Sequence, residues 1–138
     1  MNGSTSSRIH RQVFPATASS VHAARTFVTS VLITEPVSAD SISTLRLVVS
    51  ELVSNAVQHG NHDDGVEVAI DLMDDVWLRV VVTSGGEPPF AISDLAQWNI
   101  ASPDAASGRG LGIVRSLADE VSCTAADGVV TVRCRVHR

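Results

Sequence analysis

The stretch Glu51-Leu52-Val53-Ser54-Asn55-Ala56-Val57-Gln58-His59 carries two stripes of side chains at helical spacing. On a helix of 3.6 residues per turn, Glu51, Asn55 and His59 fall at i, i+4 and i+8 and form one polar stripe. The apolar stripe begins before this stretch and comprises Leu45, Val49, Leu52, Val53 and Ala56. The pattern predicts an amphipathic helix over residues 41–59, whose polar side carries a carboxylate, an amide and an imidazole.

A second motif, Gly108-Arg109-Gly110-Leu111-Gly112, is a glycine-rich loop that runs into an expected helix. Such a loop offers backbone N–H groups and the positive end of a helix dipole to a phosphate. The glycines allow close backbone approach, and Arg109 supplies a cation for a phosphate oxygen. A carboxylate base, an amide ligand for Mg²⁺ and a phosphate cradle together indicate a nucleotide site. The alternatives without a ligand are a solvated helix face and a glycine-rich helix start.

Composition restricts the class of protein. With 138 residues, of which 44% are hydrophobic, the chain has enough apolar side chains for one core. Its net charge of −5 argues against nucleic-acid binding, which usually needs a basic stripe. No apolar run reaches membrane-spanning length and no signal peptide is visible, so we expect a cytoplasmic protein without a membrane partner. We expect Cys123 and Cys134 to be buried thiols, because their spacing does not fit a metal or redox motif.

The sequence predicts a flexible tail over residues 1–11 and one domain over residues 12–138. Strands are expected at 12–16, 66–72, 77–82, 120–124 and 129–136, and helices at 21–32, 41–59 and 112–117. A glycine- and proline-containing segment from Ser84 to Gly108 has the character of a lid. This order predicts an α+β two-layer sandwich: a mixed, mostly antiparallel sheet with helices on one face.

The motifs resemble those of the GHKL ATPases with the Bergerat fold, over residues 12–138. Within that superfamily they look like the stand-alone anti-sigma-factor serine/threonine kinases. The resemblance implies ATP and Mg²⁺ as cofactors, with Glu51 as the catalytic base and Asn55 as the Mg²⁺ ligand. The other nucleotide-binding residues that it implies are His59, Gly86, Arg109, Gly110, Leu111 and Gly112.

The sequence departs from the family pattern at the adenine-binding motif. The family has an aspartate there that accepts a hydrogen bond from the adenine amino group, whereas this chain has Ser84. Neutral hydrogen bonds contribute ~0.5–1.5 kcal/mol and charge-assisted ones ~1.5–3 kcal/mol. We therefore expect ATP affinity to be lower, on the order of tenfold, than in a family member with the aspartate. Thr131, on the last strand, is expected either to bind the same water as Ser84 or to be an ordinary strand residue.

The resemblance leads to two functional hypotheses. The first is a homodimeric kinase that phosphorylates a STAS-type anti-sigma-factor antagonist and also binds a sigma factor. The second is a Bergerat-fold binding module that regulates a partner protein with ATP binding weakened or lost through Ser84. A nucleotide-gated regulator of another pathway is a third possibility.

Overall fold

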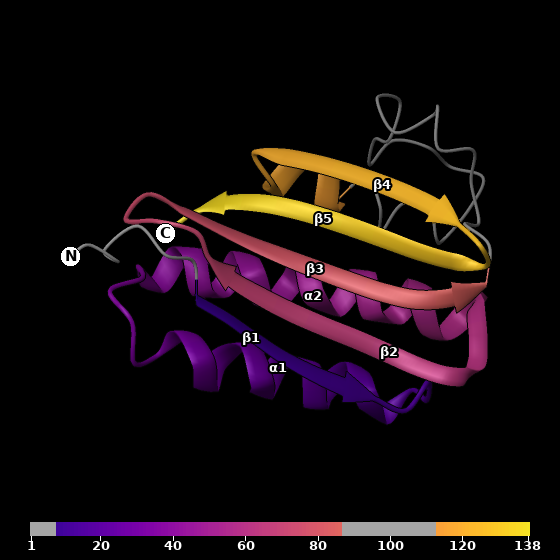
Figure 1. Cartoon of the computed structure of the whole chain (residues 1–138). Helices are drawn as coiled ribbons and strands as arrows, with labels where there is room; N and C mark the ends of the chain where they lie inside the picture. The colour runs from indigo at the N-terminus through magenta and orange to yellow at the C-terminus, as the bar shows by residue number, and fades with distance from the viewer. Residues whose placement is uncertain (1–7, 87–112) are drawn as a thin grey trace.

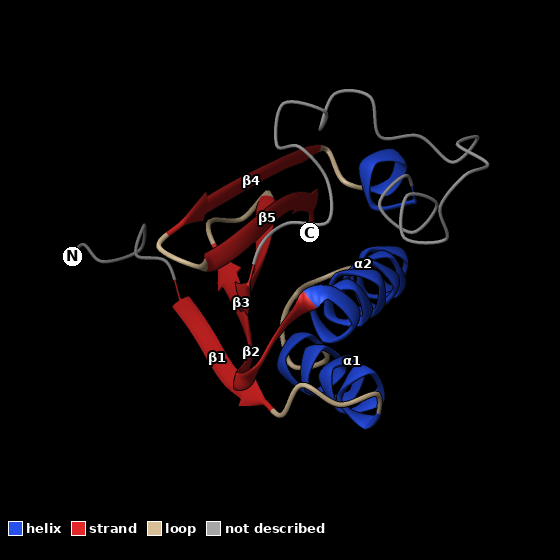
Figure 2. Cartoon of the chain, turned by 90° about the vertical axis from the view of Figure 1, so that its right-hand side faces the viewer, coloured by secondary structure: helices blue, strands red, loops and turns tan. Residues whose placement is uncertain are grey.

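The computed structural model describes residues 8–86 and 113–138, with residues 59–64 described through their backbone alone. Its elements, in chain order, are β1 (Arg8–Phe14), α1 (Ser19–Leu32), α2 (Ala39–His59), β2 (Gly60–Leu72), β3 (Trp77–Gly86), β4 (Glu120–Ala126) and β5 (Val129–His137). A short helix at residues 113–117 precedes β4. Figures 1 and 2 show the sheet as one layer and α1 and α2 as a second layer on one of its faces.

The strand order in the sheet is β1-β2-β3-β5-β4. All four neighbouring pairs are antiparallel. The predicted two-layer α+β architecture is therefore confirmed, but the predicted parallel component is absent from the sheet formed by the described residues. Because β5 lies between β3 and β4, these two strands run in the same direction without pairing.

The first strand begins earlier than the sequence pattern predicted. Residues 8–11, which were assigned to a flexible tail, belong to β1 and pair with β2 from Arg8↔Leu72 to Phe14↔Val66. The guanidinium of Arg8 also forms an ion pair with Glu35, in the turn between the two helices. Six of the seven residues of β1 are exposed, so the strand lacks the apolar alternation by which strands are recognised in a sequence.

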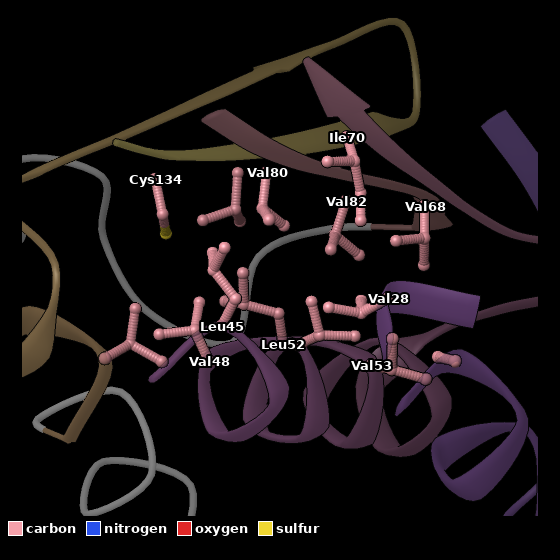
Figure 3. Packing of buried hydrophobic residues seen from close by; sticks show 14 of the residues in the cluster. Val28, Leu45, Val48, Leu52, Val53, Val68, Ile70, Val80, Val82 and Cys134 are labelled. Atoms are coloured by element: carbon pink, nitrogen blue, oxygen red, sulfur yellow. The ribbon is translucent and has the colours of Figure 1, made fainter. Parts of the chain in front are cut away.

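The core lies between α2 and the helix-facing side of the sheet. On α2, the predicted apolar stripe is buried: Leu45, Val49 and Val53 are 0% exposed and Leu52 is 3% exposed. Figure 3 shows Leu45, Leu52 and Val53 facing residues of the three central strands, namely Val68, Ile70, Val80, Val82 and Cys134. The alternation of buried residues along β3 and β5 places every second side chain of each strand in this layer.

Both cysteines are free and buried, as the sequence predicted. Burial raises the pKa of the Cys134 thiol to about 12 and also raises the pKa of Cys123. Their thiols are therefore protonated at neutral pH, which makes them apolar core groups rather than nucleophiles.

The opposite face of the sheet is polar. There Arg79 pairs with the buried Asp71 at 3.1 Å, and the guanidinium of Arg135 lies 4.2 Å from the ring centroid of Trp77. Within residues 8–86 and 113–138, no helix combines the length and the apolar composition that a membrane span requires.

Two leucines of α2 test the assignment of its faces. Replacing Leu45 with Ala removes a fully buried side chain, so we expect the free energy of unfolding to fall by about 3 kcal/mol. Leu47→Ala, at a position that is 42% exposed, should change it by less than about 0.5 kcal/mol. Urea unfolding followed by circular dichroism measures both values. Equal losses would mean that the buried face of α2 is assigned incorrectly.

Candidate functional site

Three elements converge at one end of the sheet. Helix α2 ends at His59 and β2 begins at Gly60, with no connecting residue. Gly60 pairs with Gly86, the last residue of β3, and the backbone N–H of Gly86 donates to the carbonyl oxygen of Gly128 at 2.7 Å. The end of α2, the end of β3 and the β4–β5 turn therefore meet at the right-hand side of Figure 1.

Glu51 and Asn55 lie on the border between the buried and exposed faces of α2. Both side chains are half-buried, and their neighbours Leu52 and Ala56 belong to the core. The predicted polar stripe is therefore not an ordinary solvated helix face at these two positions.

The Nδ2 atom of Asn55 is buried and has no hydrogen-bond partner among the described residues. An unsatisfied buried polar group costs about 1–3 kcal/mol, so such groups are uncommon in folded proteins. The position is therefore suited to a polar group that the described residues do not supply. His59 is the last residue of α2, and its side chain lies outside the described part of the structure.

The glycine-rich motif, Arg109, Gly110, Leu111 and Gly112 included, lies outside the described residues. So does most of the predicted lid, from residue 87 to residue 108. The helix that was predicted to follow the motif is described over residues 113–117. Its Val114 is 0% exposed and belongs to the core cluster.

Ser84 lies on the face of the sheet that is covered by the helices. It pairs with Val66 of β2 and Val130 of β5, and both valines belong to the core. Directly paired residues of an antiparallel sheet project to the same face. Ser84 is therefore on the same side of the sheet as α2, and it lies two residues before the strand end that pairs with Gly60.

The structure does not bring Thr131 to Ser84. Thr131 lies between Val130 and Val132, which both face the core, so its own side chain projects to the opposite face of the sheet. Its cross-strand neighbours there are Thr83 and Thr124. The prediction that Ser84 and Thr131 bind the same water is therefore wrong, and the alternative of an ordinary strand residue holds for Thr131. The strict alternation of β5 carried this information in the sequence.

Gly86 occupies a backbone conformation that explains its residue type. Its φ of 107° lies in the region that residues with a Cβ rarely adopt. The β4–β5 turn, whose Gly128 carbonyl accepts the hydrogen bond from Gly86, also contains residues with positive φ. Asp127 has a φ of 55° and Gly128 a φ of 75°, as in a type I′ hairpin. Asp127 and Gly128 form the turn between β4 and β5. Gly86 and this turn give β3 a fixed end.

A cavity of about 330 Å³ adjoins the backbone of Ser84 and Gly85 but opens on the other face of the sheet. Its remaining lining residues are Val13, Gly65, Glu67, Thr83 and Val129. Because Glu67 and Thr83 alternate with core-facing residues, this cavity is separated from Asn55 by the sheet.

Two solved structures resemble the whole chain. The RsbU and RsbW domains of Rv1364c from Mycobacterium tuberculosis match with a TM-score of 0.70 and 20% identity, over 95% of this chain and 33% of that one. The chain therefore spans about a third of the length of that protein. A chain of the SiaB-SiaC complex from Pseudomonas aeruginosa matches with a TM-score of 0.67 and 15% identity, over 94% and 90% of the two chains. At these identities the likeness shows the fold.

Among curated proteins, none matches the sequence. A family model described as the histidine kinase-like ATPase domain matches residues 14–135, which include α2, all of β2 and β3, and most of β5. The superfamily resemblance carried by the two sequence motifs is thereby confirmed, and the chain belongs to the histidine kinase-like ATPase domain family.

Proposed function

We propose that the chain binds ATP with Mg²⁺ and acts as a serine/threonine kinase on a STAS-type antagonist, while also binding a sigma factor. In this proposal it works in the cytoplasm as a homodimer. Membership of the ATPase family supports the nucleotide, and the resemblance of the Glu51–His59 segment to the anti-sigma-factor kinases supports the branch.

The observation that carries the proposal is the half-buried amide of Asn55. Its Nδ2 has no partner among the described residues, and an amide oxygen is a hard ligand of the kind that Mg²⁺ prefers. Mg·ATP would fit both needs: the amide oxygen of Asn55 would be a ligand for the metal, and the amide nitrogen would donate to an oxygen of the bound group. The bound nucleotide supplies the phosphoryl group that is transferred.

Glu51 lies one helical turn before Asn55 and has a half-buried side chain. As the base, its carboxylate takes the proton of the partner's seryl or threonyl hydroxyl when that oxygen bonds to the γ-phosphorus and the bond to the leaving ADP oxygen breaks. Asn55 would hold the metal at a fixed distance from this carboxylate, because both side chains project from the same helix. Ser84, at the nearby end of β3, accepts a hydrogen bond from the adenine amino group.

The similar structures also support a role in protein–protein regulation. One contains an RsbW domain beside an RsbU domain, and the other is a complex of SiaB with SiaC. In both structures, therefore, the similar chain occurs together with a second protein or domain.

A second function, a binding module without catalysis, is favoured by Ser84. This residue lies on the helix-facing side of the sheet, where the family's aspartate is expected, and it brings no charge to the adenine. A weakly held nucleotide would leave the fold as a docking platform.

Asn55→Ala tests the metal site. We expect Mg·ATP affinity to fall at least tenfold, while ATP affinity in EDTA changes little. The melting temperature should not fall, because the substitution removes an unpartnered buried amide. Isothermal titration calorimetry and thermal melting measure these effects, with Ser54→Ala as the neighbouring control. Unchanged Mg·ATP affinity would exclude Asn55 as a ligand.

Glu51→Gln separates catalysis from binding. The amide keeps the shape of the side chain but cannot take the hydroxyl proton, so phosphotransfer should fall at least a hundredfold. ATP affinity should stay within about twofold of the parent's. Transfer of labelled phosphate to the antagonist recovered by pull-down measures the rate. Glu67→Gln, on the other face of the sheet, is the matched control, and an equal loss of binding and transfer in Glu51→Gln contradicts a role as base.

Ser84→Asp restores the charge that the family uses. We expect ATP to bind on the order of tenfold more tightly, because a charge-assisted hydrogen bond replaces a neutral one. Thr83→Asp places the same charge one residue away, on the opposite face, and should not tighten binding. If both variants bind ATP as the parent does, Ser84 is not the adenine-reading residue.

A further inference from the structure

A groove lies between α1 and α2 on the surface of the helical layer. It has a volume of about 220 Å³ and is lined by Arg25, Ser43, Arg46, Leu47 and Ser50. The four residues from α2 follow the spacing i, i+3, i+4 and i+7, which defines one face of a helix. The buried stripe of α2 centres on Leu45, Leu52 and Val49, on the other side of the helix, so the groove points away from the sheet.

The groove presents two arginines without carboxylate partners. Neither Arg25 nor Arg46 forms an ion pair with any described residue, and the same holds for Arg11, Arg115 and Arg133, whereas Arg8, Arg79, Arg135 and Arg138 do. The Nε of Arg25 is buried and has no hydrogen-bond partner in the described part of the chain.

The remaining groups do not satisfy the two guanidinium groups. Ser50 uses its hydroxyl within the helix, where Oγ donates to the carbonyl oxygen of Arg46 at 2.8 Å. Leu47 is 42% exposed at the edge of the groove. In a chain with a net charge of −5, this is a local basic surface with an apolar rim.

The groove adjoins the polar stripe that carries the proposed catalytic base. Leu47 and Glu51 are four residues apart on α2, so they are separated by about 40° around the helix axis and one turn along it. A molecule bound in the groove would therefore lie beside Glu51.

We propose that this groove docks a partner protein through one of its carboxylates, which pairs with Arg25 and Arg46, while an apolar side chain of the partner packs on Leu47. Charge complementarity selects the acidic group. The exposed leucine favours a protein over a free anion, because an inorganic ion gains nothing from an apolar rim. Both arginines also lie inside their helices, away from the N-terminal N–H groups that bind small anions.

This inference concerns the partner surface of the proposed kinase, and its role in delivering a substrate depends on that function. Binding through the groove does not depend on it. A partner held by Arg25 and Arg46 would place its adjacent segment next to Glu51, so that recognition of the partner is coupled to phosphotransfer.

The first experiment places the photo-reactive residue p-benzoylphenylalanine at Leu47 in cells of the host that encodes the chain. After irradiation, mass spectrometry maps the cross-linked peptide. We expect a segment of another protein that contains Asp or Glu beside an apolar residue. No cross-link, a cross-link to a second copy of this chain, or a segment without acidic residues would overturn the proposal.

The second experiment is a charge swap with the purified protein that the first experiment identifies. Arg25→Glu and Arg46→Glu should each weaken binding roughly tenfold or more, and replacing the partner's carboxylate with Arg should restore binding to these variants. Arg11→Glu, an equal charge change on exposed β1, is the matched control and should bind normally. Arg46 is exposed, so its variant serves even if the partly buried Arg25 proves necessary for folding.

ATP titration of the same variants distinguishes this inference from the proposed function. Arg25→Glu and Arg46→Glu should bind ATP as the parent does. If the parent itself fails to bind ATP but the charge swap succeeds, docking stands and the kinase proposal fails. If the charge swap does not restore binding, the groove is not the docking site, whatever the chain does with ATP.

Discussion

The structure depends on the burial of one side of α2 against the sheet. The buried side chains of Leu45, Val49 and Leu52 pack in the core against the central strands, and this contact fixes both the rotation and the position of the helix. Close-packed interiors tolerate little change in volume, so the helix cannot rotate without opening a cavity. The directions of the remaining side chains of α2 are consequently fixed as well. Glu51 and Asn55 lie at the border of the core, and Arg46 and Leu47 lie on the outside.

One helix thereby serves three surfaces of the molecule. Its apolar side holds the sheet, its border carries the candidate nucleotide-binding groups, and its outer side forms the basic groove with α1. If the proposed catalytic group and the proposed docking surface both lie on this helix, they need no conformational relay, because the distance between them is set by the helix itself. The direct junction of α2 with β2 brings the same helix close to the end of β3, where Ser84 lies.

Sequence periodicity predicted the helices and the four later strands, although β2 begins at Gly60, six residues before the predicted start at Val66. In β3 and β5 buried residues alternate with less buried ones, whereas Cys123 is the one buried residue of β4. Periodicity located the start of β1 poorly, since that strand is an exposed edge whose pairing with β2 is made by backbone groups. It ended the third strand at residue 82 and put Ser84 in the lid segment, whereas Ser84 belongs to β3, and it did not assign Thr131 to a face. The alternation of Val130, Val132 and Cys134 with Thr131, Arg133 and Arg135 carried that assignment in the sequence. The groove was not predicted, because Arg25 and Arg46 come from two helices whose packing creates the site.

The irregular pairing at the start of β2 has a consequence for how such chains can vary. Asn61 pairs with Gly85 and Val66 pairs with Ser84, so residues 62–65 are extra residues with no opposite partner on β3. A bulge of this kind absorbs a change of length locally, whereas an insertion inside α2 would rotate everything beyond it by about 100° per residue. Length variation among related chains is therefore expected at residues 62–65, where it leaves both the helix and the strand register in place.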